Sequence, residues 1–99
     1  MDTPELAALI PGLMVGHPVH EWTLTSGRVP GEDLVVTLSP VASPERTATV
    51  RVFAGAEVFI FEFAGHDSVD FADDDNDRPE VLQERIDLAA AATLGPTRV

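Results

Sequence analysis

Glu57-Val58-Phe59-Ile60-Phe61-Glu62-Phe63 is the stretch of this 99-residue chain that says most about its architecture. Successive side chains of an extended strand point to opposite faces. One face of this stretch then carries the three phenylalanines, and the other carries Val58 and Ile60. A strand that is apolar on both faces is typical of the interior of a sheet that is covered on both sides. The stretch therefore predicts a central strand.

Three earlier stretches alternate apolar and polar residues and predict further strands, at residues 20–25, 34–39 and 47–52. The links between them are rich in turn-forming residues, and Ala54-Gly55-Ala56 is short enough to join the last two strands as a hairpin. The spacing predicts an antiparallel meander of four strands.

Helices are predicted at both ends of the chain. Residues from Pro4 onward have helical spacing of leucine and isoleucine, and we expect Pro11 to limit this helix to about two turns. A second helix is predicted at about 78–94, after an acidic loop at about 67–77, and Gly95-Pro96 ends it. Its apolar stripe consists of Leu82, Ile86, Ala89, Ala90 and Thr93, with Val81 at its edge.

The predicted fold class is therefore α+β, in a single domain over residues 1–99. A small, mainly antiparallel, four-stranded sheet carries a short N-terminal helix and a C-terminal amphipathic helix packed on one face. The other face needs a cover, which either the N-terminal helix or a second copy of the chain could provide.

The composition excludes several classes of function. Seventeen acidic residues stand against six basic ones, all arginine, and give a net charge of −11. This charge disfavours nucleic-acid phosphates and anionic membrane surfaces as partners. Cysteine is absent, which excludes disulfides and cysteine-bound metals, and the first residues lack a signal-peptide pattern. We expect a cytoplasmic protein, and the absence of lysine with abundant alanine and valine suggests a GC-rich, bacterial genome or a salt-loving host.

The acidic residues are concentrated in one part of the chain, where only Arg78 and Arg85 oppose nine of them: Asp67, Asp70, Asp73, Asp74, Asp75, Asp77, Glu80, Glu84 and Asp87. Part of this stretch has the spacing of an EF-hand calcium loop, with Asp73, Asp75, Asp77 and Glu84 at ligand positions. Arg78 replaces the glycine that the loop needs, and Pro79 starts a helix too early. An acidic loop exposed to solvent is the favoured interpretation, and no metal site is assigned.

Other chemical patterns are weak. His17 and His20 with Glu21 could form a metal site, but a loop histidine and a strand-edge histidine are the favoured interpretation. No serine lies in a nucleophile elbow, and no glycine-rich phosphate loop is present. We expect neither an enzyme nor a bound cofactor.

The leading functional hypothesis is a non-catalytic protein-binding module that presents an acidic surface to a basic partner. An inhibitor or immunity-type protein that covers a cationic active site is one form of it, by analogy alone. The expected contact residues are Asp70, Asp73, Asp74, Asp75, Asp77, Glu80 and Glu84. The alternative is a structural or assembly subunit, of a phage or secretion system for example, that forms a homo-oligomer through its sheet. A calcium-responsive module is a third possibility.

Overall fold

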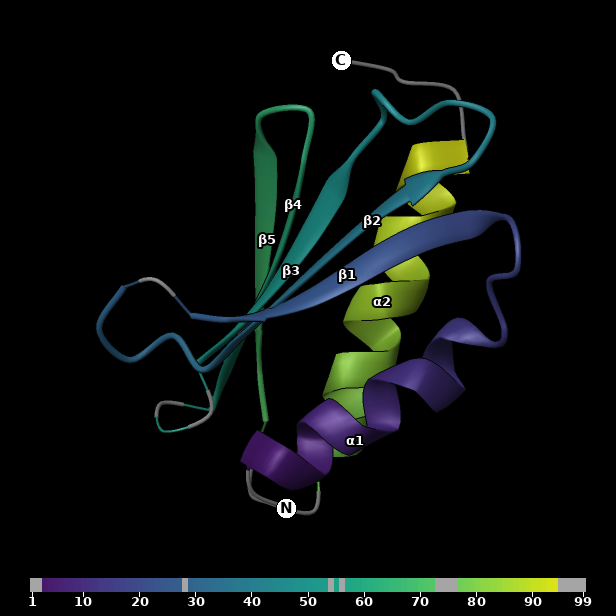
Figure 1. The fold of residues 1–99 in the computed structure, drawn as a ribbon. Helices are drawn as coiled ribbons and strands as arrows, with labels where there is room; N and C mark the ends of the chain where they lie inside the picture. The colour runs from purple at the N-terminus through teal and green to yellow at the C-terminus, as the bar shows by residue number, and fades with distance from the viewer. Residues whose placement is uncertain (1–2, 28, 54, 56, 73–76, 95–99) are drawn as a thin grey trace.

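The computed structural model describes residues 3–27, 29–53, 55, 57–72 and 77–94. Two helices, one at each end of this part of the chain, flank five consecutive strands (Figure 1). In order, the elements are α1 (Thr3–Met14), β1 (His20–Ser26), β2 (Leu34–Pro40), β3 (Ala48–Phe53), β4 (Val58–Phe63), β5 (His66–Phe71) and α2 (Arg78–Leu94).

The strands form one antiparallel sheet in the order β1-β2-β3-β4-β5, so each strand pairs with its neighbour in the sequence. The predicted α+β class and antiparallel sheet are confirmed. The predicted number of four strands is wrong, because residues 66–71 form a fifth strand, β5, where the sequence predicts the start of an acidic loop.

The turn between β4 and β5 explains the fifth strand. Ala64 and Gly65 form a two-residue loop, and both have positive φ, 54° and 80°. Positive φ at both central positions defines the type I′ turn, whose twist matches that of a two-stranded hairpin. The aspartates of β5 disfavour a strand by composition, but the turn and the pairing with β4 override that preference.

The hydrophobic core lies between the sheet and the two helices. Leu6 and Ile10 of α1 and Leu82 and Ile86 of α2 are fully buried against one face of the sheet, together with Phe59 of β4. Both helices therefore cover the same face, as Figure 1 shows. The expectation that the N-terminal helix could cover the second face is wrong, and that face, here called the open face, carries no helix within the described residues.

Helix α1 is longer than predicted. It runs for 12 residues with Pro11 inside it, where the sequence predicts about two turns. Proline lacks one hydrogen-bond donor, but Pro11 lies on the exposed side of the helix, and its carbonyl still accepts the N–H of Val15 at 3.2 Å. The tight packing of Leu6, Ile10 and Met14 outweighs the lost bond.

Helix α2 follows the predicted pattern over residues 78–94. All five residues of the predicted apolar stripe are buried, and Arg85 is buried with them, which the sequence pattern did not predict. In the described part of the chain, neither helix has the length and apolar character needed to cross a membrane.

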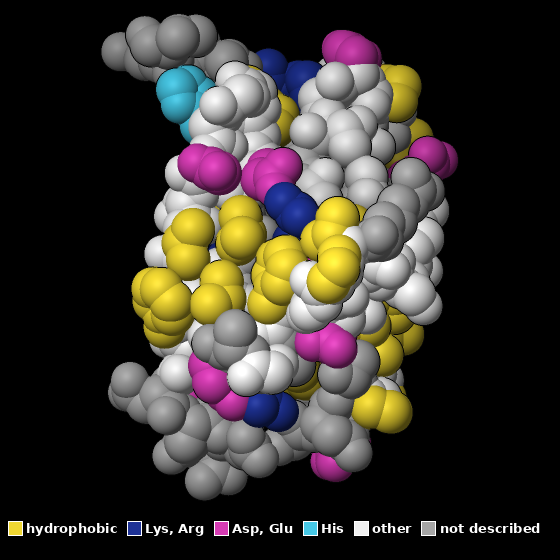
Figure 2. Space-filling model, turned by 90° about the vertical axis from the view of Figure 1, so that its left-hand side faces the viewer, with side chains coloured by type: hydrophobic (Ala, Val, Ile, Leu, Met, Phe, Trp, Pro, Cys, Tyr) yellow, Lys and Arg dark blue, Asp and Glu magenta, His cyan; other side chains and the backbone are white. Residues whose placement is uncertain are grey.

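The open face carries an apolar patch near the β4–β5 edge. The strand register places Val35, Ile60 and Val69 in one row across the sheet and Phe53, Val58 and Phe71 in the next, interrupted only by Arg51 in the first row. Val69 is 49% exposed and Phe71 is 64% exposed. Figure 2 shows this side of the molecule, with hydrophobic side chains gathered below acidic and arginine side chains. We call these six residues the open-face patch.

Candidate protein-binding surface

The two arginines of the acidic stretch are both held inside the molecule. Arg78, at the first position of α2, donates from Nε to Glu57 Oε2 at 2.7 Å and also from Nη2 to the second oxygen of that carboxylate. A guanidinium that binds both oxygens of a carboxylate makes the strongest form of this contact. The Arg78 side chain is 12% exposed, and its charge serves to fix Glu57, directly before β4, to the start of α2.

The Arg78 guanidinium lowers the pKa of the Glu57 carboxyl by its hydrogen bonds and its charge. A carboxyl whose pKa is depressed in the folded chain contributes stability above its ordinary pKa. That contribution is lost as the pH falls through the folded pKa. The Arg78–Glu57 pair is therefore intact at neutral pH.

Arg85 is the second of these arginines, and it joins α2 to the edge strand β5. Its Nη1 donates to Ser68 Oγ at 2.9 Å, and its Nη2 lies 3.3 Å from Glu84 Oε1 and 3.8 Å from Asp70 Oδ2. The Arg85 side chain is only 8% exposed, whereas those of Glu84 and Asp70 are 64% and 41% exposed. The arginine is thus turned inward and its carboxylates are turned outward.

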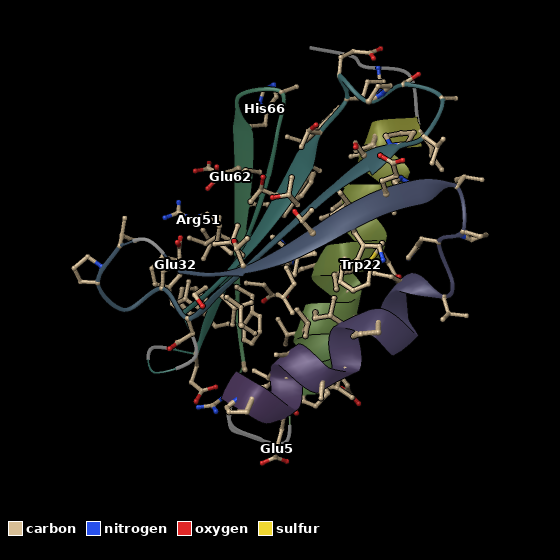
Figure 3. The ribbon with its side chains drawn as sticks, viewed as in Figure 1. Glu5, Trp22, Glu32, Arg51, Glu62 and His66 are labelled. Atoms are coloured by element: carbon tan, nitrogen blue, oxygen red, sulfur yellow. The ribbon has the colours of Figure 1, made fainter. Side chains whose placement is uncertain are left out.

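The other described arginines are also held within the chain. On the open face, Arg51 donates to Glu32 at 2.5 Å and to Glu62 at 2.9 Å, and these hydrogen bonds raise the pKa of Arg51 (Figure 3). Arg46 donates to the backbone carbonyls of Ala92 and Thr93, in the last turn of α2, where carbonyls lack helical partners. Each arginine that the structure describes therefore has an intramolecular partner.

The structure brings only some of the expected contact residues together. Asp70 on β5 and Glu84 on α2 meet at Arg85, and Glu80 lies one helical turn before Glu84 on the same helix. Asp77 precedes α2, and its carbonyl accepts the N–H of Val81 at 3.0 Å. The remaining three residues, Asp73, Asp74 and Asp75, lie outside the described residues. We call Asp70, Asp77, Glu80 and Glu84 the acidic surface.

The calcium-loop pattern lies partly outside the described residues, at Asp73 and Asp75. Its last member, Glu84, lies on α2 and faces Arg85 at 3.3 Å. Among the residues that the structure describes, no group of three or more histidine, aspartate or glutamate side chains is placed to hold a metal ion.

The two histidines that the sequence offers as possible metal ligands, His17 and His20, each have a protein partner. His17 Nε2 lies 2.8 Å from Asp87 Oδ1, and His20 Nε2 lies 2.7 Å from Thr93 Oγ1. The Thr93 hydroxyl donates to the carbonyl of Ala90, so it accepts a hydrogen bond from His20 Nε2. His20 is the first residue of the edge strand β1, as the sequence predicts, and it is 7% exposed. Its Nδ1 is buried without a hydrogen-bond partner within the described residues.

We expect His20 to make folding pH-dependent. Burial lowers the pKa of His20, the neighbouring His17 lowers it further, and the Ala90 carbonyl opposes both. The unfolded chain therefore binds more protons than the folded one just below the ordinary histidine pKa of about 6.5. The free energy of unfolding should fall as the pH drops from about 7 through this window.

Denaturant unfolding at several pH values, with His20→Gln as the test variant, measures this contribution. The glutamine amide can still donate to Thr93 but does not titrate, so the pH dependence should flatten. The same substitution at exposed His66 is the control. An unchanged slope in His20→Gln would show that another group is responsible.

A hollow on the open face, of about 460 Å³, is lined mainly by threonines of β1, β2 and β3 and by the group of Arg51, Glu32 and Glu62. Its one arginine is already paired with two carboxylates, so the described lining has no uncompensated positive charge for an anionic substrate. The described lining of this hollow contains no histidine that could act as a general base for the threonine hydroxyls.

Comparison with protein-family models, with curated proteins and with solved structures found no match to this chain. Its function must therefore be inferred from the geometry of its own residues.

Two features of this surface were not predicted from the sequence, Arg85 and the strand β5. Arg85 lies three residues after Leu82 and four before Ala89, which is the spacing of the buried stripe. The spacing of the buried stripe could therefore have predicted that Arg85 is buried. For β5, the signal was the alternation of Val69 and Phe71 with polar residues directly after Ala64-Gly65.

Proposed function

We propose that this chain is a non-catalytic protein-binding module that presents its acidic surface to a basic partner. The observation that carries the proposal is the inward placement of the arginines. With Arg78 and Arg85 nearly buried, the described carboxylates of the acidic stretch are exposed or half-buried, whereas the two arginines of that stretch are turned inward. A surface field of one sign attracts a partner of the other sign and speeds its association.

An inhibitor or immunity-type protein is one form of this function. Its acidic surface would cover a cationic active site, such as that of a nucleic-acid-cleaving toxin, in the cytoplasm. The absence of cysteine fits that compartment. The partner in this form is a protein with clustered arginine or lysine.

Capture from a lysate of the source organism tests the proposal. We expect the chain, immobilised as bait, to retain a basic protein at low salt and to lose it at high salt, because salt screens exposed charges. Recovery of the same proteins at both salt concentrations, none of them basic, would contradict the proposal.

Two matched variants locate the contact. Glu80→Gln with Glu84→Gln removes two charges from the acidic surface, and Glu21→Gln with Glu45→Gln removes two exposed charges elsewhere. The first pair should reduce capture of the basic protein, because these side chains face the partner, whereas the second pair should leave it nearly unchanged. Equal losses from both pairs would mean that only total charge matters.

The uncovered open face favours a second candidate function, that of an assembly subunit that self-associates through its sheet. The open-face patch includes Phe71 and Val69, which are about half exposed or more. Contacts between apolar faces are unchanged or strengthened by salt. Sedimentation of the free chain at low and high salt separates the candidates: an oligomer that persists at high salt favours assembly, and a monomer at both favours the acidic module.

A further inference from the structure

Strand β5 forms one outer edge of the sheet, and among the described residues it pairs only with β4. The strand β1 forms the other edge, beside α1. In an antiparallel pair, hydrogen-bonded and non-hydrogen-bonded residue pairs alternate, so every second residue of an edge strand directs its N–H and C=O away from the sheet.

The alternation in β5 is fixed at both of its ends. The two-residue turn makes Phe63 and His66 a hydrogen-bonded pair. At the far end, the N–H of Ala72 donates to the Glu57 carbonyl at 3.0 Å, which continues the same alternation. The residues between the hydrogen-bonded pairs therefore direct their backbone groups outward, and these residues are Asp67, Val69 and Phe71.

The outward backbone groups adjoin two different surfaces. The side chains of Val69 and Phe71 lie on the open face and extend the open-face patch to the edge of the sheet. On the helix side, Ser68 and Asp70 lie beside Arg85, and Glu84 is adjacent. Asp70 Oδ1 also accepts the N–H of Phe71 at 2.8 Å, so one outward donor is already used. Within the described part of the chain, the outward N–H groups of Asp67 and Val69 have no further strand to bind.

We propose that β5 binds an extended segment of the basic partner as a sixth, antiparallel strand. The inference rests on the proposed function and specifies how the partner is held. Apolar side chains of the segment pack beside Val69 and Phe71, and alternate arginine or lysine side chains face Asp70 and Glu84. Main-chain hydrogen bonds supply affinity in this mode, and the alternate side chains supply specificity.

Charge complementarity selects this occupant over a second copy of the chain. Pairing of two β5 strands would bring Asp67, Asp70 and Glu84 of both copies to one seam, and charges of the same sign held close together disfavour association. The arginine beside this seam, Arg85, is already held by Ser68, Asp70 and Glu84 of its own chain. A cationic segment instead supplies the missing opposite charge.

The geometry predicts which backbone nitrogens of the segment bind. Directly opposed residues of an antiparallel pair have their side chains on the same face. Residues that hydrogen-bond to Asp67 and Val69 therefore place their side chains on the open face, and these are the apolar ones. The cationic residues direct their own N–H groups to solvent.

A short peptide of alternating arginine and valine is the probe, studied by calorimetric titration of the full chain. Methylation of the valine nitrogens removes the donors that face β5, and methylation of the arginine nitrogens removes only donors that face solvent. We expect the first peptide to bind roughly tenfold more weakly than the unmethylated one, or worse. The second should bind nearly as well as the unmethylated peptide, and all three carry the same charge.

The outcomes separate the two proposals. Equal binding of the three peptides, lost at high salt, would overturn strand addition and leave the acidic module standing. If no arginine peptide binds at low salt, strand addition fails, and the proposed function loses support with it. In a second measurement, hydrogen exchange of the Asp67 and Val69 amides should slow when the unmethylated peptide is bound, and unchanged exchange at saturation would overturn strand addition.

Discussion

Replacing Phe59 with alanine should lower the free energy of unfolding by about 4 kcal/mol. Phe59 is fully buried on the helix-covered face of β4, beside Val52 of β3, and is the largest of the fully buried side chains that the structure describes. Its removal costs both the transfer free energy of the ring and the cavity that remains. Urea unfolding followed by circular dichroism measures the loss.

Phe71→Ala is the matched control, because it removes the same side chain from a position that is 64% exposed on the open face. The change in the free energy of unfolding should stay within about 0.5 kcal/mol. A loss at Phe71 as large as that at Phe59 would show that the open face is covered in solution, and would support self-association.

Gly27→Ala should destabilise the chain by about 3 kcal/mol, for a different physical reason. A Cβ at Gly27 would lie 1.7 Å from the carbonyl oxygen of Glu32, which is backbone and cannot rotate away. The link between β1 and β2 would have to move, and with it the hydrogen bond from the Gly27 N–H to the Asp33 carbonyl at 3.3 Å. Thermal unfolding gives the size of the effect.

Gly12→Ala is the control for this substitution. Gly12 lies inside α1, and a Cβ added there would meet no described atom of another element within 4 Å, so alanine fits without a clash. Alanine is the better helix former, and the free energy of unfolding should rise by about 0.5–1 kcal/mol. If Gly27→Ala is tolerated as well as Gly12→Ala, the β1–β2 link has another conformation.

The parts of the fold that the sequence predicts are those with a clear hydrophobic period. Strands β1 to β3 alternate apolar and polar residues, and the stripe of α2 recurs every three to four residues, so their buried sides follow from the sequence. Strand β4 is apolar on both faces, which predicts its interior position in the sheet. The strand β5 is not predicted in this way, because its aspartates resemble a loop. It forms because the turn at Ala64-Gly65 returns the chain along β4.

The candidate site was less predictable than the fold. The concentration of carboxylates is visible in the sequence, but the positions of Arg78 and Arg85 depend on contacts with distant residues. Glu57 lies 21 residues from Arg78, and Ser68 lies 17 residues from Arg85. Only the folded chain shows that both cations are turned inward and that Asp70 and Glu84 meet at the β5 edge.

Association rates are the decisive test of whether the acidic surface attracts a basic partner. We would measure the rate constant between the chain and the basic protein that it captures, over a series of salt concentrations. We predict a rate that falls steeply with salt, and a shallower dependence for Glu80→Gln with Glu84→Gln than for the Glu21→Gln, Glu45→Gln control. A rate that is independent of salt, and equal in both variants, would contradict this attraction.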